Sequence, residues 1–192
     1  MSEITVLAIP GSLRAGSINA SLCREAARLA PADLKVEHYV GLGEIPHYDA
    51  DLDAEEAPQA VADLRERISA ADALLIATPE YNGGIPGALK NALDWASTPY
   101  GASVLTGMPV AVMGATPGRS GTAGAQAHLR QVLARIGCEV VAQPEVMVSK
   151  AYDVLDDRGR LTDDAVGESI AGVLDQLRLA VSAGAELVAS AA

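Results

Sequence analysis

The stretch Ile4-Thr5-Val6-Leu7-Ala8-Ile9-Pro10-Gly11 decides the fold class. Its first six residues form a short, mostly apolar run, and the Pro-Gly pair ends that run. Such a run is typical of a strand that is buried on both faces, as strands of a parallel sheet are. Similar runs follow at 73–77 and 110–114, the first of them ended by Thr78-Pro79. The sequence therefore predicts a parallel sheet in the centre of the molecule.

Segments with helical periodicity alternate with these strands. We expect helices at 19–30, 61–71, 86–95, 125–136 and 163–189, and two more strands at 34–40 and 139–142. The segment 41–58 is rich in Gly, Pro and Asp and is expected to be a surface loop. Five strands that alternate with helices predict an α/β, doubly wound domain. Since we find neither an internal repeat nor a linker, we expect one domain over residues 1–192.

Composition narrows the function classes. The 192 residues are 49% hydrophobic and 20% charged, as in a globular protein. With 14 Lys+Arg against 25 Asp+Glu, the formal net charge is −11, which disfavours nucleic acid and anionic membranes as partners. The sequence has no apolar run near the ~20 residues of a membrane span. The start of the chain and its two cysteines, which lack metal-ligand spacing, indicate a cytoplasmic protein without a secretory signal or metal site.

The loop after the first strand has the features of an anion site. In doubly wound sheets, ligands bind beyond the carboxyl ends of the strands. Backbone N–H groups at the start of the next helix favour an anion, Ser12, Ser17 and Asn19 add neutral donors, and Arg14 adds a guanidinium group suited to phosphate. The loop lacks the lysine of a Walker motif and the glycine pattern of a dinucleotide fingerprint. A turn capped by Ser17 or Asn19 is the alternative to phosphate binding.

The loops after the third and fourth strands are candidates for holding a flat ligand. Loop 78–87 combines prolines, which stiffen it, with glycines, which let the backbone approach a heteroaromatic ring closely. Tyr81 either packs on such a ring or is an ordinary half-exposed loop residue. Glu80 is a weak candidate for a general base, because a single loop carboxylate is usually solvated. Loop 114–121 is again rich in glycine and hydroxyl groups.

Two motifs resemble a known family. Gly11-Ser12-Leu13-Arg14 with Ser17 and Asn19 is the first, and Pro79-Glu80-Tyr81-Asn82 followed by Pro86-Gly87-Ala88-Leu89-Lys90-Asn91-Ala92-Leu93-Asp94-Trp95 is the second. Together they are similar to the NADPH-dependent FMN reductase family, closest to its bacterial quinone, chromate and azo-dye reductase branch. The resemblance spans about Ile4 to Val148 and implies a flavodoxin-like fold, in which three layers enclose a doubly wound, five-stranded parallel sheet of order 2-1-3-4-5.

The resemblance also implies the residues that bind FMN. Its phosphate would lie in the first loop, its isoalloxazine ring along the second, and the third loop would touch the ring. The implied residues are Ser12, Arg14, Ser17 and Asn19, then Pro79, Glu80, Tyr81, Asn82 and Gly83, then Ala115 and Thr116, with Gly118 as a further candidate. Arg119 has three interpretations: a contact for the phosphates of a nicotinamide dinucleotide, a subunit contact, or a solvated side chain.

These observations predict an FMN-dependent NAD(P)H oxidoreductase with a ping-pong order. NADPH or NADH would pass hydride to the flavin and leave, and a quinone, an azo compound, chromate or a flavin would then take the same pocket. No side chain is expected to act as a catalytic acid or base, and buried Cys23 is expected to belong to the core. The alternatives are a flavodoxin-type electron carrier without direct nicotinamide oxidation and an interaction module without a cofactor.

The resemblance implies a homodimer or homotetramer. Leu89, Leu93 and Trp95 are candidate apolar contacts between subunits. The alternative is that these three side chains face the sheet of their own subunit, and the sequence does not separate the two.

Overall fold

The sheet has the predicted topology. The computed structural model describes residues 3–55 and 57–191, and their side chains apart from those of 54, 55 and 185–191. Its strands are β1 Ile4–Pro10, β2 Leu34–His38, β3 Ala73–Ala77, β4 Pro109–Ala115, β5 Glu139–Val140 and β6 Val146–Val148. The order β2-β1-β3-β4-β5 confirms the prediction, all pairs are parallel, and β6 is a sixth strand that also pairs with β4.

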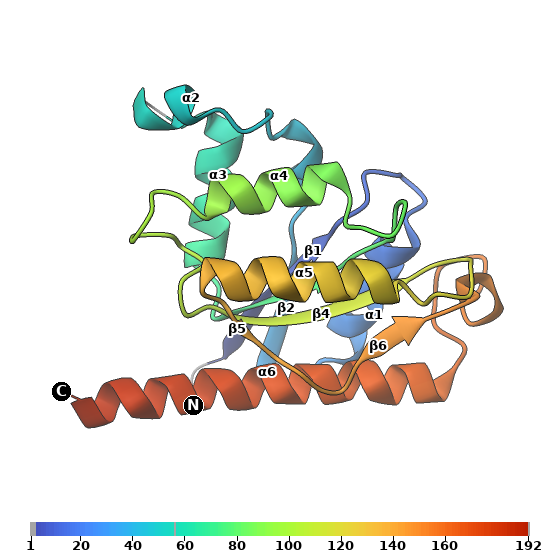
Figure 1. Cartoon of the computed structure of the whole chain (residues 1–192). Helices are drawn as coiled ribbons and strands as arrows, with labels where there is room; N and C mark the ends of the chain where they lie inside the picture. Colours follow the sequence, from blue (N-terminus) through green and yellow to red (C-terminus); the bar gives the residue numbers. More distant parts are fainter. Residues whose placement is uncertain (1–2, 56, 192) are drawn as a thin grey trace.

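Helices cover both faces of the sheet, which explains why its central strands β1, β3 and β4 are mostly apolar. Helices α1 Ile18–Leu29 and α6 Asp164–Ala191 lie on one face, and α3 Gln59–Ser69, α4 Gly87–Ala96 and α5 Ala123–Ile136 lie on the other (Figure 1). Along β1, Leu7 and Ile9 join the core under α3, α4 and α5, while Val6 and Ala8 join the core under α1 and α6. This alternation has the period of two that a strand requires.

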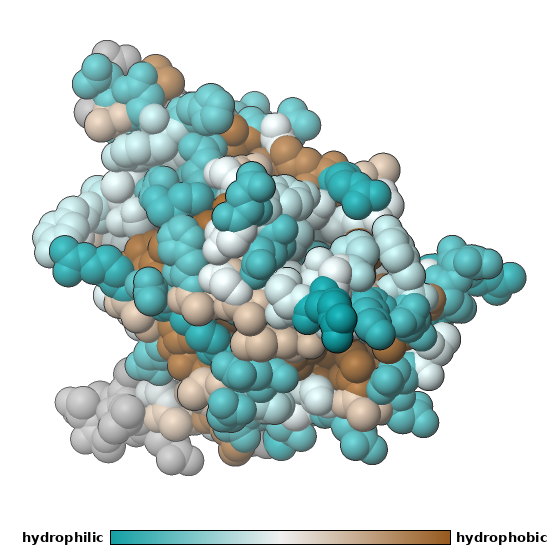
Figure 2. Space-filling view, turned by 45° about the vertical axis from the view of Figure 1, so that its right-hand side comes forward, coloured by the Kyte–Doolittle hydropathy of each residue, from teal (hydrophilic) through white to brown (hydrophobic). Residues whose placement is uncertain are grey.

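The outer surface is mostly polar. On the face shown in Figure 2, hydrophilic residues predominate and apolar atoms show mainly in the recesses between them. No helix in the described part of the chain combines the length and the apolar character that crossing a membrane requires.

The segment 41–58 is more ordered than its composition predicts, so the expected surface loop is wrong. It holds a short 3-10 helix, η1 Gly41–Glu44, and the helix α2 Ala50–Glu55. Leu42 and Ile45 are buried in the core. Two side chains of α4 hold the segment, because Asn91 Nδ2 and Trp95 Nε1 both donate to the carbonyl oxygen of Pro46 at 2.8 Å.

The expected fifth strand at 139–142 is also different in the structure. The chain pairs with the start of β4 only through Glu139–Val140, leaves the sheet, and returns as Val146–Val148 beside the end of β4. Pro144 lies in the interruption, where it has no N–H group to donate to a ladder. A second 3-10 helix, η2 Ala151–Asp153, follows β6.

The candidate subunit contacts on α4 face their own core. Leu89, Leu93 and Trp95 are 1%, 2% and 0% exposed. Trp95 also meets the ring of Tyr48 edge-on, with 5.0 Å between the ring centroids. The second motif of the sequence therefore stabilises the chain's own fold at these positions, and the interpretation as subunit contacts is wrong.

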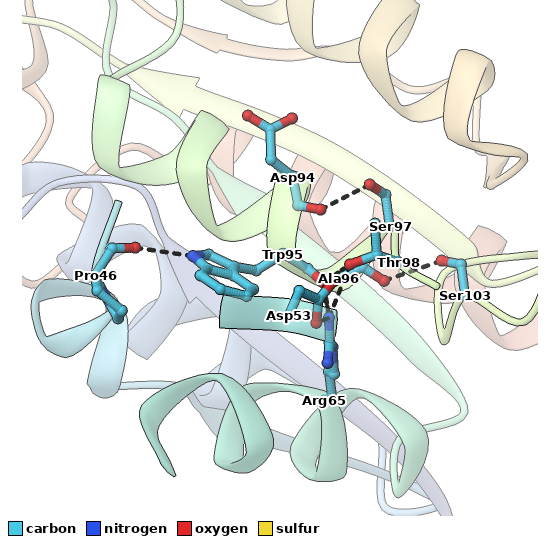
Figure 3. Close-up of polar contacts among 9 residues, drawn as sticks. All are labelled: Pro46, Asp53, Arg65, Asp94, Trp95, Ala96, Ser97, Thr98 and Ser103. Atoms are coloured by element: carbon cyan, nitrogen blue, oxygen red, sulfur yellow. Dashed lines mark hydrogen bonds and ion pairs between the residues drawn. The ribbon is translucent and has the colours of Figure 1, made fainter. Parts of the chain in front are cut away.

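Arg65 of α3 joins three elements at the end of α4 (Figure 3). Its Nη2 lies 2.7 Å from Asp53 Oδ1 of α2 and 2.8 Å from both the carbonyl oxygen of Trp95 and Thr98 Oγ1. Its guanidinium carbon lies 6.0 Å from the Trp95 ring centroid. Burial alone would raise the pKa of Asp53, but hydrogen bonds from Thr98 and Arg65 outweigh burial and lower it.

Replacing Arg65 tests this junction. Arg65→Ala should lower the free energy of unfolding by about 2–3 kcal/mol, because it removes the charged partner of a largely buried carboxylate and one of the donors to the Trp95 carbonyl oxygen. Arg67→Ala on the same helix is the matched control. It removes a more exposed ion pair with Glu37 and should cost less than about 1 kcal/mol. Equilibrium urea unfolding measures both, and equal losses would contradict the role of Arg65.

Candidate functional site

The three candidate loops meet at the carboxyl ends of β1, β3 and β4, on the right-hand side of Figure 1. A pocket of about 90 Å³ lies between them. All of the predicted site residues except Asn82, Gly83 and the further candidate Gly118 line this pocket, as do Ile18 and Pro117, which the sequence did not single out. The topology thus brings together residues that lie as much as a hundred positions apart in the sequence.

The first loop offers free donors to this pocket. Ser17 is the N-cap of α1, and its hydroxyl oxygen accepts from Ala20 N at 3.1 Å. The hydroxyl proton of Ser17 is left for a ligand, since the cap uses only the oxygen. Arg14 is exposed, and no carboxylate in the described part of the chain lies within 4.0 Å of its guanidinium nitrogens. A positive group beside free hydroxyl and N–H donors suits a phosphate.

Asn19 fastens the first loop to the third. Its Nδ2 donates to the carbonyl oxygen of Ala115 at 3.0 Å, and its Oδ1 accepts from Ala115 N at 2.9 Å. The side chain is 3% exposed, so both bonds are shielded from water. This pairing leaves Asn19 one amide hydrogen for a ligand and fixes the distance between the start of α1 and the end of β4.

Glu80 fastens the second loop to α5. The residue before α5, Thr122, has the left-handed φ of 67° and its side chain makes no capping hydrogen bond. Glu80 Oε2 accepts from Ala125 N at 3.0 Å instead. A carboxylate at a helix N-terminus is stabilised by the helix dipole as well as by this bond. Glu80 therefore helps to hold the N-terminus of α5, a contact that the sequence did not predict.

Asn82 and Gly83 lie at the tip of a tight turn and do not line the pocket. Tyr81 and Gly84 exchange backbone hydrogen bonds of 3.0 and 3.1 Å across them. Their φ angles are 53° and 78°, as a type I′ turn requires at both central positions. The Asn-Gly dipeptide is the sequence signal for such a turn. The predicted contact of these two residues with a flavin ring stays a prediction.

The third loop depends on Gly114, which the sequence did not single out as a site residue. A Cβ atom on Gly114 would overlap Thr122 Oγ1 and lie 2.5 Å from the carbonyl oxygen of Thr78. Thr122 is fully buried in this space. The end of β4 therefore needs glycine for the second and third loops to come together.

A second pocket adjoins the first. It measures about 360 Å³, and it shares Arg14 and Tyr81 with the smaller pocket. Leu13, Pro86 and Ala88 give it an apolar lining. Tyr81 is 48% exposed, and its hydroxyl lies 3.4 Å from Ser12 Oγ. The residues present therefore fit FMN, since a phosphate-sized pocket with a free guanidinium group opens beside apolar surface for a flat ring.

The cysteines lie outside this chemistry. Cys23 on α1 is fully buried, and burial raises the pKa of its thiol to about 12, although Arg24 opposes the shift. Burial also raises the pKa of Cys138 to about 11. Neither group forms a thiolate near neutral pH, so Cys23 belongs to the core as expected.

Two substitutions at Glu80 separate its hydrogen bond from its charge. Glu80→Ala should lower the free energy of unfolding by about 1–2 kcal/mol, because Ala125 N loses its acceptor. Glu80→Gln keeps an acceptor oxygen and should restore most of that loss. Urea unfolding of both variants checks this, and an equal loss in Glu80→Gln would show that the charge, rather than the hydrogen bond, holds the helix.

Comparison with known proteins agrees with this geometry. The model of the NADPH-dependent FMN reductase family matches residues 4–153. The chain is similar to an NAD(P)H-dependent FMN reductase of Pseudomonas aeruginosa, at 47% identity over 177 residues that cover 92% of this chain and 95% of the relative. It is also similar to a 2-hydroxy-1,4-benzoquinone reductase of a Burkholderia species, at 38% identity over 90% of this chain and 93% of the relative.

A solved structure supports the same relationship. The flavoenzyme NAD(P)H:(acceptor) oxidoreductase of Paracoccus denitrificans matches with a TM-score of 0.85 and 37% identity, over 93% of this chain and 97% of that one. The family match covers most of the sequence, and the first and second loops that define the resemblance both lie within it. The chain therefore belongs to the NADPH-dependent FMN reductase family.

Proposed function

We propose that the chain is an FMN-dependent NAD(P)H oxidoreductase that reduces small quinone-type acceptors. The observation that carries this proposal is the pair of adjoining pockets at the end of β1. Arg14 lines both of them, the smaller is lined by hydroxyl groups, and the larger is apolar. The family and the relatives named as FMN and quinone reductases support the same activity.

In this proposal, the chain's own residues bind FMN and orient it. FMN, when bound, supplies the hydride chemistry. Arg14, Ser12 and Ser17 would bind its phosphate, and Pro79, Tyr81, Ala115 and Thr116 would contact its ring. The nicotinamide donor and the acceptor use the open side of the site in turn, which gives a ping-pong order.

No side chain needs to move a proton for this role. Glu80, the carboxylate that lines the smaller pocket, already accepts a hydrogen bond from Ala125 N. The protein contributes by holding donor and acceptor at reacting distance and by keeping polar groups in place before the reaction. The alternative, an electron carrier of the flavodoxin type, is less favoured because the full-length relatives are named as nicotinamide-dependent reductases.

We propose further that the protein forms a homodimer or homotetramer in the cytoplasm. Because Leu89, Leu93 and Trp95 are buried, the contact would use the outer sides of α4 and α5 instead. A groove of about 330 Å³ lies there, with Val132 and Ile136 among its lining residues. Both cysteines are free, which is compatible with a reducing compartment.

Arg14→Ala tests the phosphate assignment. It should weaken FMN binding at least about tenfold, since a hydrogen bond to a charged group contributes about 1.5–3 kcal/mol. Turnover in saturating FMN should change much less. Arg14→Lys keeps the charge but loses the planar guanidinium group. Its FMN affinity should lie between those of the unsubstituted protein and of Arg14→Ala. Fluorescence titration of FMN measures the affinities, and an unchanged dissociation constant in Arg14→Ala would contradict the assignment.

Anaerobic reduction tests the activity itself. Adding NADPH or NADH to the FMN-loaded protein should bleach the visible flavin absorbance rapidly, and adding a benzoquinone should restore it. A stopped-flow absorbance record measures both half-reactions. A flavin that stays oxidised with either nicotinamide would favour the electron-carrier function instead.

A further inference from the structure

A cavity separate from the predicted FMN site lies beside helix α1. It measures about 570 Å³, within the range of about 300–1,000 Å³ that small-molecule sites occupy. It lies between the first half of α1 and the hairpin-like segment 155–161, which is part of the orange loop at the far right of Figure 1. Ile18 lines both this cavity and the smaller pocket of the predicted site, so the two are neighbours.

The cavity is held open by paired charges behind it. Glu25 on α1 is 2% exposed, and its carboxylate lies 2.8 Å from Arg28 Nη2 and 3.6 Å from Arg160 Nη1. Arg160 belongs to segment 155–161, so this ion pair fixes the segment to α1. Gly159 packs closely against the helix, where a Cβ atom would lie 2.6 Å from Ser21 Oγ. The walls are therefore formed before any ligand binds.

The arginines that line the cavity differ from the paired arginines behind it. Arg24 and Arg158 both line it, and within residues 3–55 and 57–191 neither has a carboxylate within 4.0 Å. Arg24 donates only to Ser21 Oγ, at 2.8 Å. These two guanidinium groups are therefore available to a phosphate group.

The remaining lining groups match a nucleoside. Tyr152 lines the cavity and is 64% exposed, and an aromatic ring can stack on a purine base. Asp156 Oδ1 accepts from Arg158 N and Arg160 N at 2.9 and 2.8 Å, and Asp157 also lines the cavity. A carboxylate that faces a cavity accepts hydrogen bonds from hydroxyl groups, as the 2′- and 3′-hydroxyls of a ribose can provide.

We propose that this cavity binds the adenosine phosphate part of a dinucleotide. This proposal rests on the proposed function, because the flavin or nicotinamide end of the dinucleotide would be held at the neighbouring FMN site. Two molecules carry the same chemistry. In FAD the adenosine phosphate is attached to the FMN phosphate, and in NADH, whose adenosine ribose keeps its 2′-hydroxyl, it belongs to the hydride donor.

Calorimetric titration of AMP into the FMN-saturated protein tests the site. AMP should bind, and Arg158→Ala and Tyr152→Ala should each weaken it, the former at least about tenfold. Arg135→Ala, which removes an exposed arginine on α5, is the matched control and should leave AMP affinity unchanged. No binding heat at millimolar AMP, or AMP affinity that ignores Arg158→Ala and Tyr152→Ala, would overturn the proposal.

The Arg158→Ala variant also shows which of the two molecules supplies the adenosine phosphate. If it is FAD, Arg158→Ala should lower FAD affinity toward that of FMN and leave FMN affinity unchanged. If it is NADH, the variant should raise the KM for NADH with little change in kcat and no change in FAD affinity. If neither quantity moves, the proposal is wrong. FMN affinity is measured separately, so a failure of the proposed function would appear as absent FMN binding, whereas a failure of this proposal would appear as absent AMP binding.

Discussion

The site depends on one buried amide. Asn19 on α1 pairs with both backbone polar groups of Ala115 at the end of β4. Because the pair is shielded from water, leaving either group of Ala115 without its partner would cost about 1–3 kcal/mol. The bond joins the two loops on which a ligand would rest, and the sheet between them sets their spacing. The pairing of Asn19 with Ala115 therefore fixes the distance between the first and third loops of the site.

The polar groups of the site divide into two kinds. Asn19 and Glu80 are committed to the framework, since each bonds to a backbone group of another element. The Arg14 guanidinium group and the hydroxyl proton of Ser17 have no partner within the part of the chain that the structure describes. A site of this kind can be rigid and still have donors left for a ligand. The same division recurs at the larger cavity, where Glu25 is paired and Arg158 is not.

Patterns within short stretches of sequence predicted most of the fold, and contacts between distant residues explain the rest. The run at Ile4–Ile9 identified β1, since a strand covered on both faces is apolar throughout. The four loop residues of the phosphate site were found because their chemistry suits an anion, but the partner of Asn19 is 96 positions away and no local signal predicts it. Composition misled at 41–58, where contacts with Trp95 order a segment rich in glycine and proline.

A crystal structure of the protein with FMN tests the account most directly. The account predicts the FMN phosphate within hydrogen-bond distance of Arg14 and Ser17, with Asn19 still bonded to Ala115 and Glu80 still bonded to Ala125. A phosphate bound elsewhere, or an Asn19 side chain that has left Ala115 to bind it, would contradict the account.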